Sequence, residues 1–217
     1  MIHQLIFAAP RPGLSPAMFQ DYWIHVHAQD FASKIPQIKK YKVSRIFTEG
    51  EDLAFHGMAE IWLENEAEQL ESLQSSEFIN GARADEPKWA AFWASLCLDT
   101  TTQPIIEAPA QYTHKRVILM KRKGGIPLSV FRKYALDTLG NAAQAVGDVQ
   151  GACLCIANDG LYALGEARFD GAFQLWFSNR SAGENAKATD AYKRLLAEIH
   201  EACDCVLDFM CEETTII

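Results

Sequence analysis

An internal repeat constrains the fold of this 217-residue chain more than any other feature of its sequence. Residues 55–65 and 169–179 both follow the pattern F-x-G-x-x-x-[IL]-W-x-x-N, at an offset of 114 positions. Upstream, a Pro/Gly turn leads to an F-x-x-Y pattern at 19–22 and again at 131–134, at an offset of 112. Two matches in the same order at nearly equal offsets indicate a tandem duplication.

Both halves show the same predicted order of elements. The predicted elements of the first half are strands over 2–9, 41–47, 55–63 and 93–101, helices over 15–34 and 66–74, and a turn at 49–52. Those of the second half are strands over 114–121, 151–157, 165–177 and 203–212 and helices over 128–145 and 185–200. Each order reads βαββαβ, the ferredoxin-like arrangement.

The boundary between the halves is expected in residues 100–112, where threonine, proline and alanine crowd together as in a linker. We therefore predict one repeat over 1–104 and a second over 112–217. A four-stranded sheet with helices on one face leaves its other face uncovered, and an uncovered apolar face in water is costly. The predicted fold class is α+β, with two ferredoxin-like repeats packed sheet to sheet as an intramolecular α/β barrel.

Charge and composition exclude several classes of function. The net charge of −8 and the pI near 5.2 disfavour nucleic acid as a partner. No apolar run approaches the roughly 20 residues that span a bilayer, and no basic segment resembling an export signal opens the chain, so a cytoplasmic location without membrane contact is expected. The six cysteines include two Cys-x-Cys pairs, at 153/155 and 203/205, for which a metal is the lesser alternative; their spacing is not that of structural zinc, so we predict reduced, mostly buried thiols and no metal.

One helix carries a stripe of residues suited to chemistry. Phe19, Trp23 and His27 are spaced four apart and share one face of the predicted helix. An imidazole among aromatic rings can act as a general base or acid near neutral pH. On periodicity alone, a structural histidine at the edge of the core is the simpler interpretation. Asp30, three residues beyond His27, is expected to be a solvated carboxylate.

The same helix carries the motif of a known family. Residues 13–28 read G-L-S-P-x-x-F-x-x-Y-W-x-x-V-H-A, which resembles the signature of the EthD family within the dimeric α/β-barrel superfamily. In the second half, Ala135 takes the place of Trp23 and Leu139 that of His27. The resemblance therefore implies one active half and one degenerate partner.

The resemblance implies a small-molecule enzyme, a class that includes cofactor-free monooxygenases, polyketide cyclases and isomerases. Its substrate would be an aromatic, polyketide-like or other apolar carbonyl compound, converted by a cyclase, isomerase, lyase or monooxygenase reaction. In this hypothesis His27 moves the proton and Tyr22 hydrogen bonds an oxyanion. The expected substrate-binding residues are Phe19, Trp23, Tyr41 and His56.

Alternatives remain open at this stage. The chain lacks the Gly-rich nucleotide-binding motifs and the G-x-S-x-G elbow of serine hydrolases, so no cofactor is expected. Whether it is an enzyme at all is open: a non-catalytic module for an apolar ligand or for assembly is one alternative, and a haem-handling protein with His27 or His56 as ligand is another. Pairing of two chains into a homodimer is also open.

Overall fold

The computed structural model describes residues 1–47 and 53–217, so the turn predicted at 49–52 lies outside the described residues. The chain forms two compact units, one of residues 1–99 with 213–217 and the other of residues 100–212. Two strands, β4 (Leu96–Ile106) and β8 (Cys203–Thr215), begin in one unit and end in the other. None of the helices formed by the described residues is long and apolar enough to cross a bilayer.

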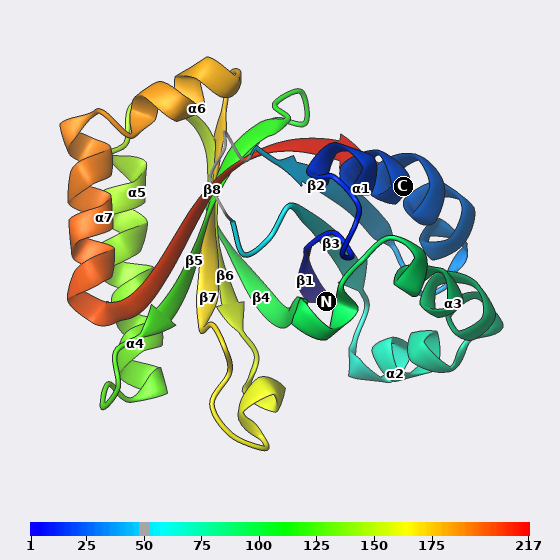
Figure 1. Ribbon diagram of the computed structural model, residues 1–217. Helices are drawn as coiled ribbons and strands as arrows, with labels where there is room; N and C mark the ends of the chain where they lie inside the picture. The colour runs from blue at the N-terminus through cyan, green and yellow to red at the C-terminus, as the bar shows by residue number, and fades with distance from the viewer. Residues whose placement is uncertain (48–52) are drawn as a thin grey trace. The chain divides into compact units, whose positions relative to one another are not determined.

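The first unit has three further strands and a helical layer (Figure 1). Its strands β1, β2 and β3 pair antiparallel with β3 in the centre. Backbone bonds join Tyr41 of β2 to Ile216 and Ile217, so the end of the chain belongs to this sheet. The elements are β1 (Ile2–Ala8), α1 (Pro16–Tyr22), η1 (Trp23–Phe31), η2 (Ala32–Lys34), β2 (Lys40–Ile46), β3 (Gly57–Leu63), α2 (Glu66–Gln74), η3 (Glu77–Ala82), α3 (Arg83–Asp85), η4 (Glu86–Lys88) and η5 (Phe92–Ala94).

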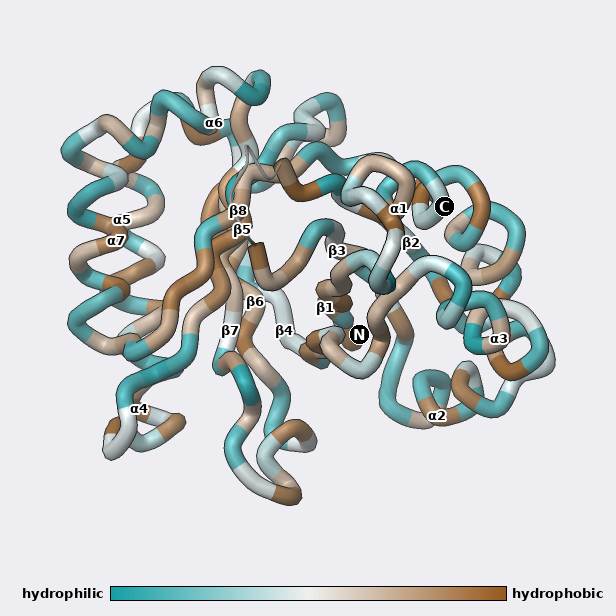
Figure 2. Tube along the Cα trace, viewed as in Figure 1, coloured by the Kyte–Doolittle hydropathy of each residue, from teal (hydrophilic) through white to brown (hydrophobic). Residues whose placement is uncertain are grey.

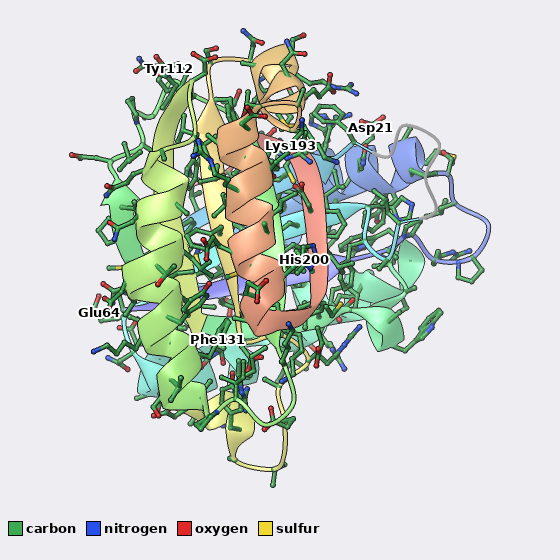
Figure 3. The ribbon with its side chains drawn as sticks, turned by 90° about the vertical axis from the view of Figure 1, so that its left-hand side faces the viewer. Asp21, Glu64, Tyr112, Phe131, Lys193 and His200 are labelled. Atoms are coloured by element: carbon green, nitrogen blue, oxygen red, sulfur yellow. The ribbon has the colours of Figure 1, made fainter. Side chains whose placement is uncertain are left out.

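The second unit repeats this plan. Strand β5 lies between β7 and β8, and β6 lies between β7 and β4, all antiparallel. Figure 3 shows α5 and α7 side by side over this sheet, with Lys193 and His200 on α7 and Phe131 on the neighbouring α4. The elements are β5 (His114–Arg122), α4 (Leu128–Tyr134), η6 (Ala135–Leu139), α5 (Gly140–Gln144), β6 (Val149–Ala157), η7 (Asp159–Tyr162), β7 (Gly171–Phe177), α6 (Arg180–Ala186) and α7 (Asp190–Ala202).

The predicted fold class is confirmed. Each unit follows the βαββαβ order, and the hydrogen-bonded strand order β1-β3-β2-β8-β5-β7-β6-β4 is that of a closed antiparallel barrel. In each unit an apolar core fills the space between strands and helices. Figure 2 shows this division in the second unit, where the middle of β5 is hydrophobic and α7 alternates between hydrophobic and hydrophilic positions.

Three predicted elements differ in extent. The strand predicted over 165–177 begins only at Gly171, because the buried Asp170 carboxylate before it accepts bonds from the backbone N–H of Arg122 and the hydroxyl of Tyr162. The helix predicted over 185–200 is split in two, with Thr189 capping α7 by accepting a bond from the backbone N–H of Tyr192. Residues 100–106, predicted as linker, continue β4 and pair with β6.

The helix of the first motif extends over the predicted range but changes its hydrogen-bonding pattern. Ser15 caps α1 by accepting a bond from the backbone N–H of Met18, and Pro16 occupies the first turn, where its missing N–H costs nothing. From Trp23 to Phe31 the helix takes π geometry, and a 3₁₀ turn ends it at Lys34. Such π segments are rare and short in most helices. This one positions the residues of the site.

Candidate active site

The predicted aromatic stripe is buried around a residue that the motif does not contain. Phe19, Trp23 and His27 are all buried against the first sheet or its covering segments. The ring of Trp89 lies between them, with its centroid 4.7 Å from that of His27, 4.9 Å from Trp23 and 5.4 Å from Phe19. Trp89 thus joins the three side chains into one aromatic cluster.

A carboxylate directly contacts the imidazole of His27. Nδ1 of His27 lies 3.0 Å from Oδ2 of Asp85, and the two residues are 5% and 1% exposed. Because an ionised carboxylate can only accept hydrogen bonds, we assign the proton to Nδ1. In this tautomer Nε2 carries the lone pair that can take a proton from a ligand. His27 and Asp85 therefore form a buried His–Asp pair, 58 residues apart in the chain.

Two further donors share the Asp85 carboxylate. The hydroxyl of Tyr22 donates to Oδ1 at 2.9 Å, and Nζ of Lys88 donates to the same oxygen at 3.0 Å. Burial raises the pKa of Asp85, but the hydrogen bonds from His27, Lys88 and Tyr22 together lower it more, so the pKa lies below its ordinary value. Asp85 is therefore held as a carboxylate beside the imidazole.

The same network fixes the protonation of its other members. Burial lowers the pKa of His27 below its ordinary value, and the bond to and charge of Asp85 offset part of this effect. Burial and the neighbouring Asp85 raise the pKa of Tyr22. At neutral pH the site thus holds a neutral imidazole, a neutral phenol and an ionised carboxylate. This combination suits a general base, the imidazole of His27, that is oriented by the carboxylate of Asp85.

The segment that supplies Asp85 and Trp89 is irregular but firmly placed. It runs through the short helical turns η3, α3 and η4. Beyond them, the backbone N–H of Arg11 donates to the carbonyl of Trp89 at 3.0 Å, and that of Ala91 donates to Ala9 at 3.0 Å. These bonds fasten the segment to the end of β1. No sequence pattern indicated that Asp85 and Trp89 would meet His27.

Trp23 is seated on the sheet by its own contacts. Its Nε1–H donates to the hydroxyl of Tyr41 at 3.3 Å. Burial raises the pKa of Tyr41 far above its ordinary value, so this hydroxyl stays neutral. Gly57 of β3 lies under the ring: a Cβ at that position would stand 2.8 Å from the Cζ3 atom of Trp23. The glycine of the repeated F-x-G motif therefore makes room for the tryptophan of the family motif.

The remaining predicted residues take different places. His56 is half-buried before β3, where its backbone carbonyl accepts a bond from Nε2 of Gln20 at 2.8 Å. Asp30 is exposed, which confirms the prediction of a solvated carboxylate, and His25 is exposed as well. The structure thus brings together His27, Tyr22, Phe19 and Trp23 directly, and Tyr41 through Trp23.

Two polar groups beside the pair were not anticipated. The Nε1–H of Trp89 is buried and hydrogen bonds to no other residue in the described parts of the chain. An unpaired buried donor costs about 1–3 kcal/mol, so it marks a position where a ligand acceptor would be stabilising. Glu86, next to Asp85, is mostly buried, and burial raises its pKa to about 7 despite the nearby Arg83.

Comparison with known proteins finds a family similarity within the first repeat. Residues 11–92 match the EthD domain model, and no curated protein matches the chain. Among solved structures, an anthrone oxidase-like protein shares 12% identity over 99% of this chain and 92% of its own, with a TM-score of 0.65. A proposed monooxygenase from Fusobacterium nucleatum subsp. nucleatum ATCC 25586 shares 6% over 99% and 93%, with a TM-score of 0.58.

A third structure agrees in fold. A proposed monooxygenase from Lactobacillus acidophilus NCFM shares 13% identity over 99% of this chain and 94% of its own, with a TM-score of 0.53. At such identities these likenesses show the fold, and they extend over both repeats. The matched residues 11–92 contain the whole motif helix together with Asp85 and Trp89. The first repeat of this chain is therefore similar to the EthD family over residues 11–92, within a chain of dimeric α/β-barrel fold.

Proposed function

We propose that this protein is a small-molecule enzyme in which His27, oriented by Asp85, transfers a proton at a carbon next to a carbonyl group. The observation that carries the proposal is the buried hydrogen bond between Nδ1 of His27 and Asp85. A carboxylate that holds the imidazole in one tautomer raises the fraction of time in which Nε2 is ready as a base.

The proposed chemistry uses groups that the site already holds. Nε2 of His27 takes the proton from the carbon, the electron pair of the broken C–H bond forms a C=C bond, and the carbonyl oxygen becomes an enolate. The buried Nε1–H of Trp89 is suited to hydrogen bond that oxygen as its charge develops. The proton then returns to the product at another atom, or the enolate reacts with an electrophile such as dioxygen.

The surroundings favour an aromatic or polyketide-like carbonyl compound as substrate. The rings of Trp89 and Phe31 flank the imidazole, with centroids 4.7 and 6.3 Å away. The hydroxyl of Tyr22 donates a hydrogen bond to Asp85, so in this geometry it positions the carboxylate.

Proton exchange offers the most direct test. A panel of aromatic carbonyl compounds that begins with anthrone, suggested by the anthrone oxidase-like neighbour, would be incubated anaerobically in D₂O and followed by NMR. We expect exchange of the acidic C–H to be catalysed by the wild type and slowed about 10²–10⁴-fold in His27→Ala. His25→Ala, at an exposed position two residues away, serves as the matched control and should exchange at the wild-type rate.

The same material distinguishes an enzyme from a binding module. If dioxygen is the electrophile, admitting air to anthrone should consume one O₂ per anthraquinone and water formed. A non-catalytic binder would retain the affinity for these compounds in His27→Ala and exchange protons no faster than buffer. Equal exchange by wild type and His27→Ala would contradict the proposed role of His27.

A further inference from the structure

Two cysteines of β6 face each other in the second unit, outside the candidate active site. Cys153 and Cys155 are both buried, and their Sγ atoms lie 4.0 Å apart. Alternate residues of a strand point to the same side, so the spacing of two places both thiols on one face of the sheet. The pair is independent of the EthD motif, which lies in the first repeat.

Polar groups from the neighbouring strands point at one of these sulfurs. Nε2 of Gln174 on β7 donates to Sγ of Cys155 at 3.7 Å, and the hydroxyl of Thr102 on β4 lies 3.7 Å from the same atom. Hydrogen bonds to a thiolate stabilise it and tune metal binding by the sulfur.

The separation of the sulfurs distinguishes two possible uses of the pair. A disulfide requires the sulfurs to approach to about 2.05 Å, half the present separation. Two thiolates on opposite sides of one ion, each at a zinc-like bond length of about 2.3 Å, would lie roughly 4.6 Å apart. The observed 4.0 Å is a non-bonded contact, from which the sulfurs would have to separate by roughly 0.6 Å to bind an ion between them but approach by about 2 Å to form a disulfide.

The number of ligands selects the kind of ion. Within residues 1–47 and 53–217, no group of three or more His, Cys, Asp or Glu side chains is arranged to hold a metal. Zinc in a structural site takes four protein ligands, which this pair cannot supply. Thiolates are soft ligands that select Cu(I), and two of them give it a low coordination number.

We propose that Cys153 and Cys155 form a two-thiolate binding site for Cu(I). On binding, each thiol releases one proton to solvent and each sulfur forms one bond to the ion, so that Cu⁺ and two S–H groups give an S–Cu–S bridge with one net negative charge. No electron is transferred. Gln174 and Thr102 hold the metal-bound sulfur of Cys155 through hydrogen bonds.

An anaerobic titration of the full chain with Cu(I) in competition with a Cu(I) chelator tests the proposal. We expect one tightly bound ion, and native mass spectrometry should show the mass of one copper less two protons. Cys153→Ser and Cys155→Ser should each abolish this binding. The matched control is the double variant Cys203→Ser/Cys205→Ser, which removes the other Cys-x-Cys pair, whose two thiols have different surroundings, one buried and one exposed. It should bind as the wild type does.

Two measurements keep the test decisive if a serine variant folds poorly. X-ray absorption of the copper-loaded wild type should show two sulfur ligands, and Gln174→Leu should weaken binding about 10-fold through the lost hydrogen bond. Binding that survives both single serine variants, binding lost in the control, or preference for Zn(II) over Cu(I) would each overturn the proposal. Failure here would leave the His27 proposal unaffected, since the sites share no residue.

Discussion

The helices that follow the first strand of each repeat share one backbone arrangement, called here the frame, but carry different side chains at the positions of the candidate site. Phe19 and Phe131 are both fully buried at corresponding positions. Both helices also change to π geometry directly after a tyrosine, in η1 (Trp23–Phe31) and η6 (Ala135–Leu139). The frame is thus common to both repeats.

Even the hydrogen bond of the tyrosine recurs. The hydroxyl of Tyr22 donates to Asp85, and that of Tyr134 donates to the carboxylate of Glu198 at 2.9 Å. Tyr134 follows Tyr22 by 112 positions and Glu198 follows Asp85 by 113, which matches the offsets of the repeat. Asp85 is buried, however, whereas Glu198 is exposed.

Three side chains of the candidate site differ between the two repeats. Leu139 stands for His27, Ala135 for Trp23 and, at the offset of 113, Ala202 for Trp89. The second repeat therefore has neither the base nor the aromatic rings around it. Although π segments often mark functional sites, here one persists without the histidine, so it belongs to the inherited fold. What differs between the repeats, and not what they share, identifies the residues of the proposed chemistry.

Exchanging the histidine tests this comparison most severely. His27→Leu gives the first repeat the residue of the second, and we expect the exchange rate of the best substrate to fall about 10²–10⁴-fold because the base is lost. The unfolding free energy should fall by about 1–3 kcal/mol, since buried Asp85 loses one donor but keeps two. Substrate turnover and urea unfolding provide the two measurements.

The reciprocal substitution serves as its control. Leu139→His places an imidazole on the π segment of the second repeat without the ring of a tryptophan beside it and with an exposed carboxylate nearby. We expect no gain of exchange activity in a His27→Leu background. A gain there would show that the frame alone suffices for catalysis, contrary to the comparison.

The two tyrosine–carboxylate pairs should respond differently to neutralisation. Asp85→Asn removes the anion that holds Nδ1–H, so the imidazole can adopt the other tautomer, and we expect the exchange rate to fall about 10–1000-fold. Because Asp85 raises the pKa of His27 against the effect of burial, the acidic limb of the pH–rate profile should shift to lower pH. Glu198→Gln should leave rate and profile unchanged. A lower rate with an unshifted profile would make the effect of Asp85 merely structural.

The sequence predicted the frame well and the site in part, for one physical reason. The periodicity of a strand or helix is a local property, so the βαββαβ order, the helix over 15–34 and the stripe of Phe19, Trp23 and His27 on one helix face could be predicted from neighbours in the chain. The repeat then predicted the second unit. The change to π geometry left no such signal.

Asp85 and Trp89 could not be predicted because nothing local distinguishes them. They lie in a series of short irregular turns, where no periodicity tells which side chain faces the core. Their role comes from contacts with residues 58 and more positions away. The tyrosine–carboxylate pairs, at offsets of 112 and 113, are a signal that is visible only after the structure has shown which carboxylates meet the tyrosines.

The motif glycines of the two repeats should also prove different. A Cβ at Gly57 would meet the ring of Trp23, whereas one at Gly171 would stand 2.6 Å from the carbonyl oxygen of Cys155. We expect Gly57→Ala and Gly171→Ala each to lower the unfolding free energy by about 1–3 kcal/mol through overpacking. In a Trp23→Ala background, which copies Ala135, the cost of Gly57→Ala should shrink by at least about 0.5 kcal/mol and that of Gly171→Ala should not. Equal costs in both backgrounds would show that Trp23 does not constrain the glycine.

The smallest expected effect concerns Glu86, whose counterpart at the offset of 113 is the buried Ile199. Burial raises the pKa of Glu86 from about 4.5 to about 7, so between these values the unfolded chain releases its proton first and stability falls as pH rises. The lowered pKa of His27 acts oppositely: the unfolded chain binds a proton first, so stability falls as pH drops below 6.5.

Glu86→Gln should remove the fall of stability with rising pH, so that only the dependence due to His27 remains. At pH 8 we expect this variant to be about 1–2 kcal/mol more stable than the wild type, and at pH 4.5 equally stable. The expected gain is smaller than the full shift of the Glu86 pKa would give, because solvent and Arg83 screen the charge. Between pH 4.5 and 6.5 its stability should rise with pH, and adding His27→Leu should flatten that rise. Urea unfolding across this range, followed by tryptophan fluorescence, measures both. A parallel pair of curves for wild type and Glu86→Gln would mean that Glu86 has the same pKa in the folded protein as in the unfolded chain, and that its burial, unlike that of Ile199, is compensated by Arg83.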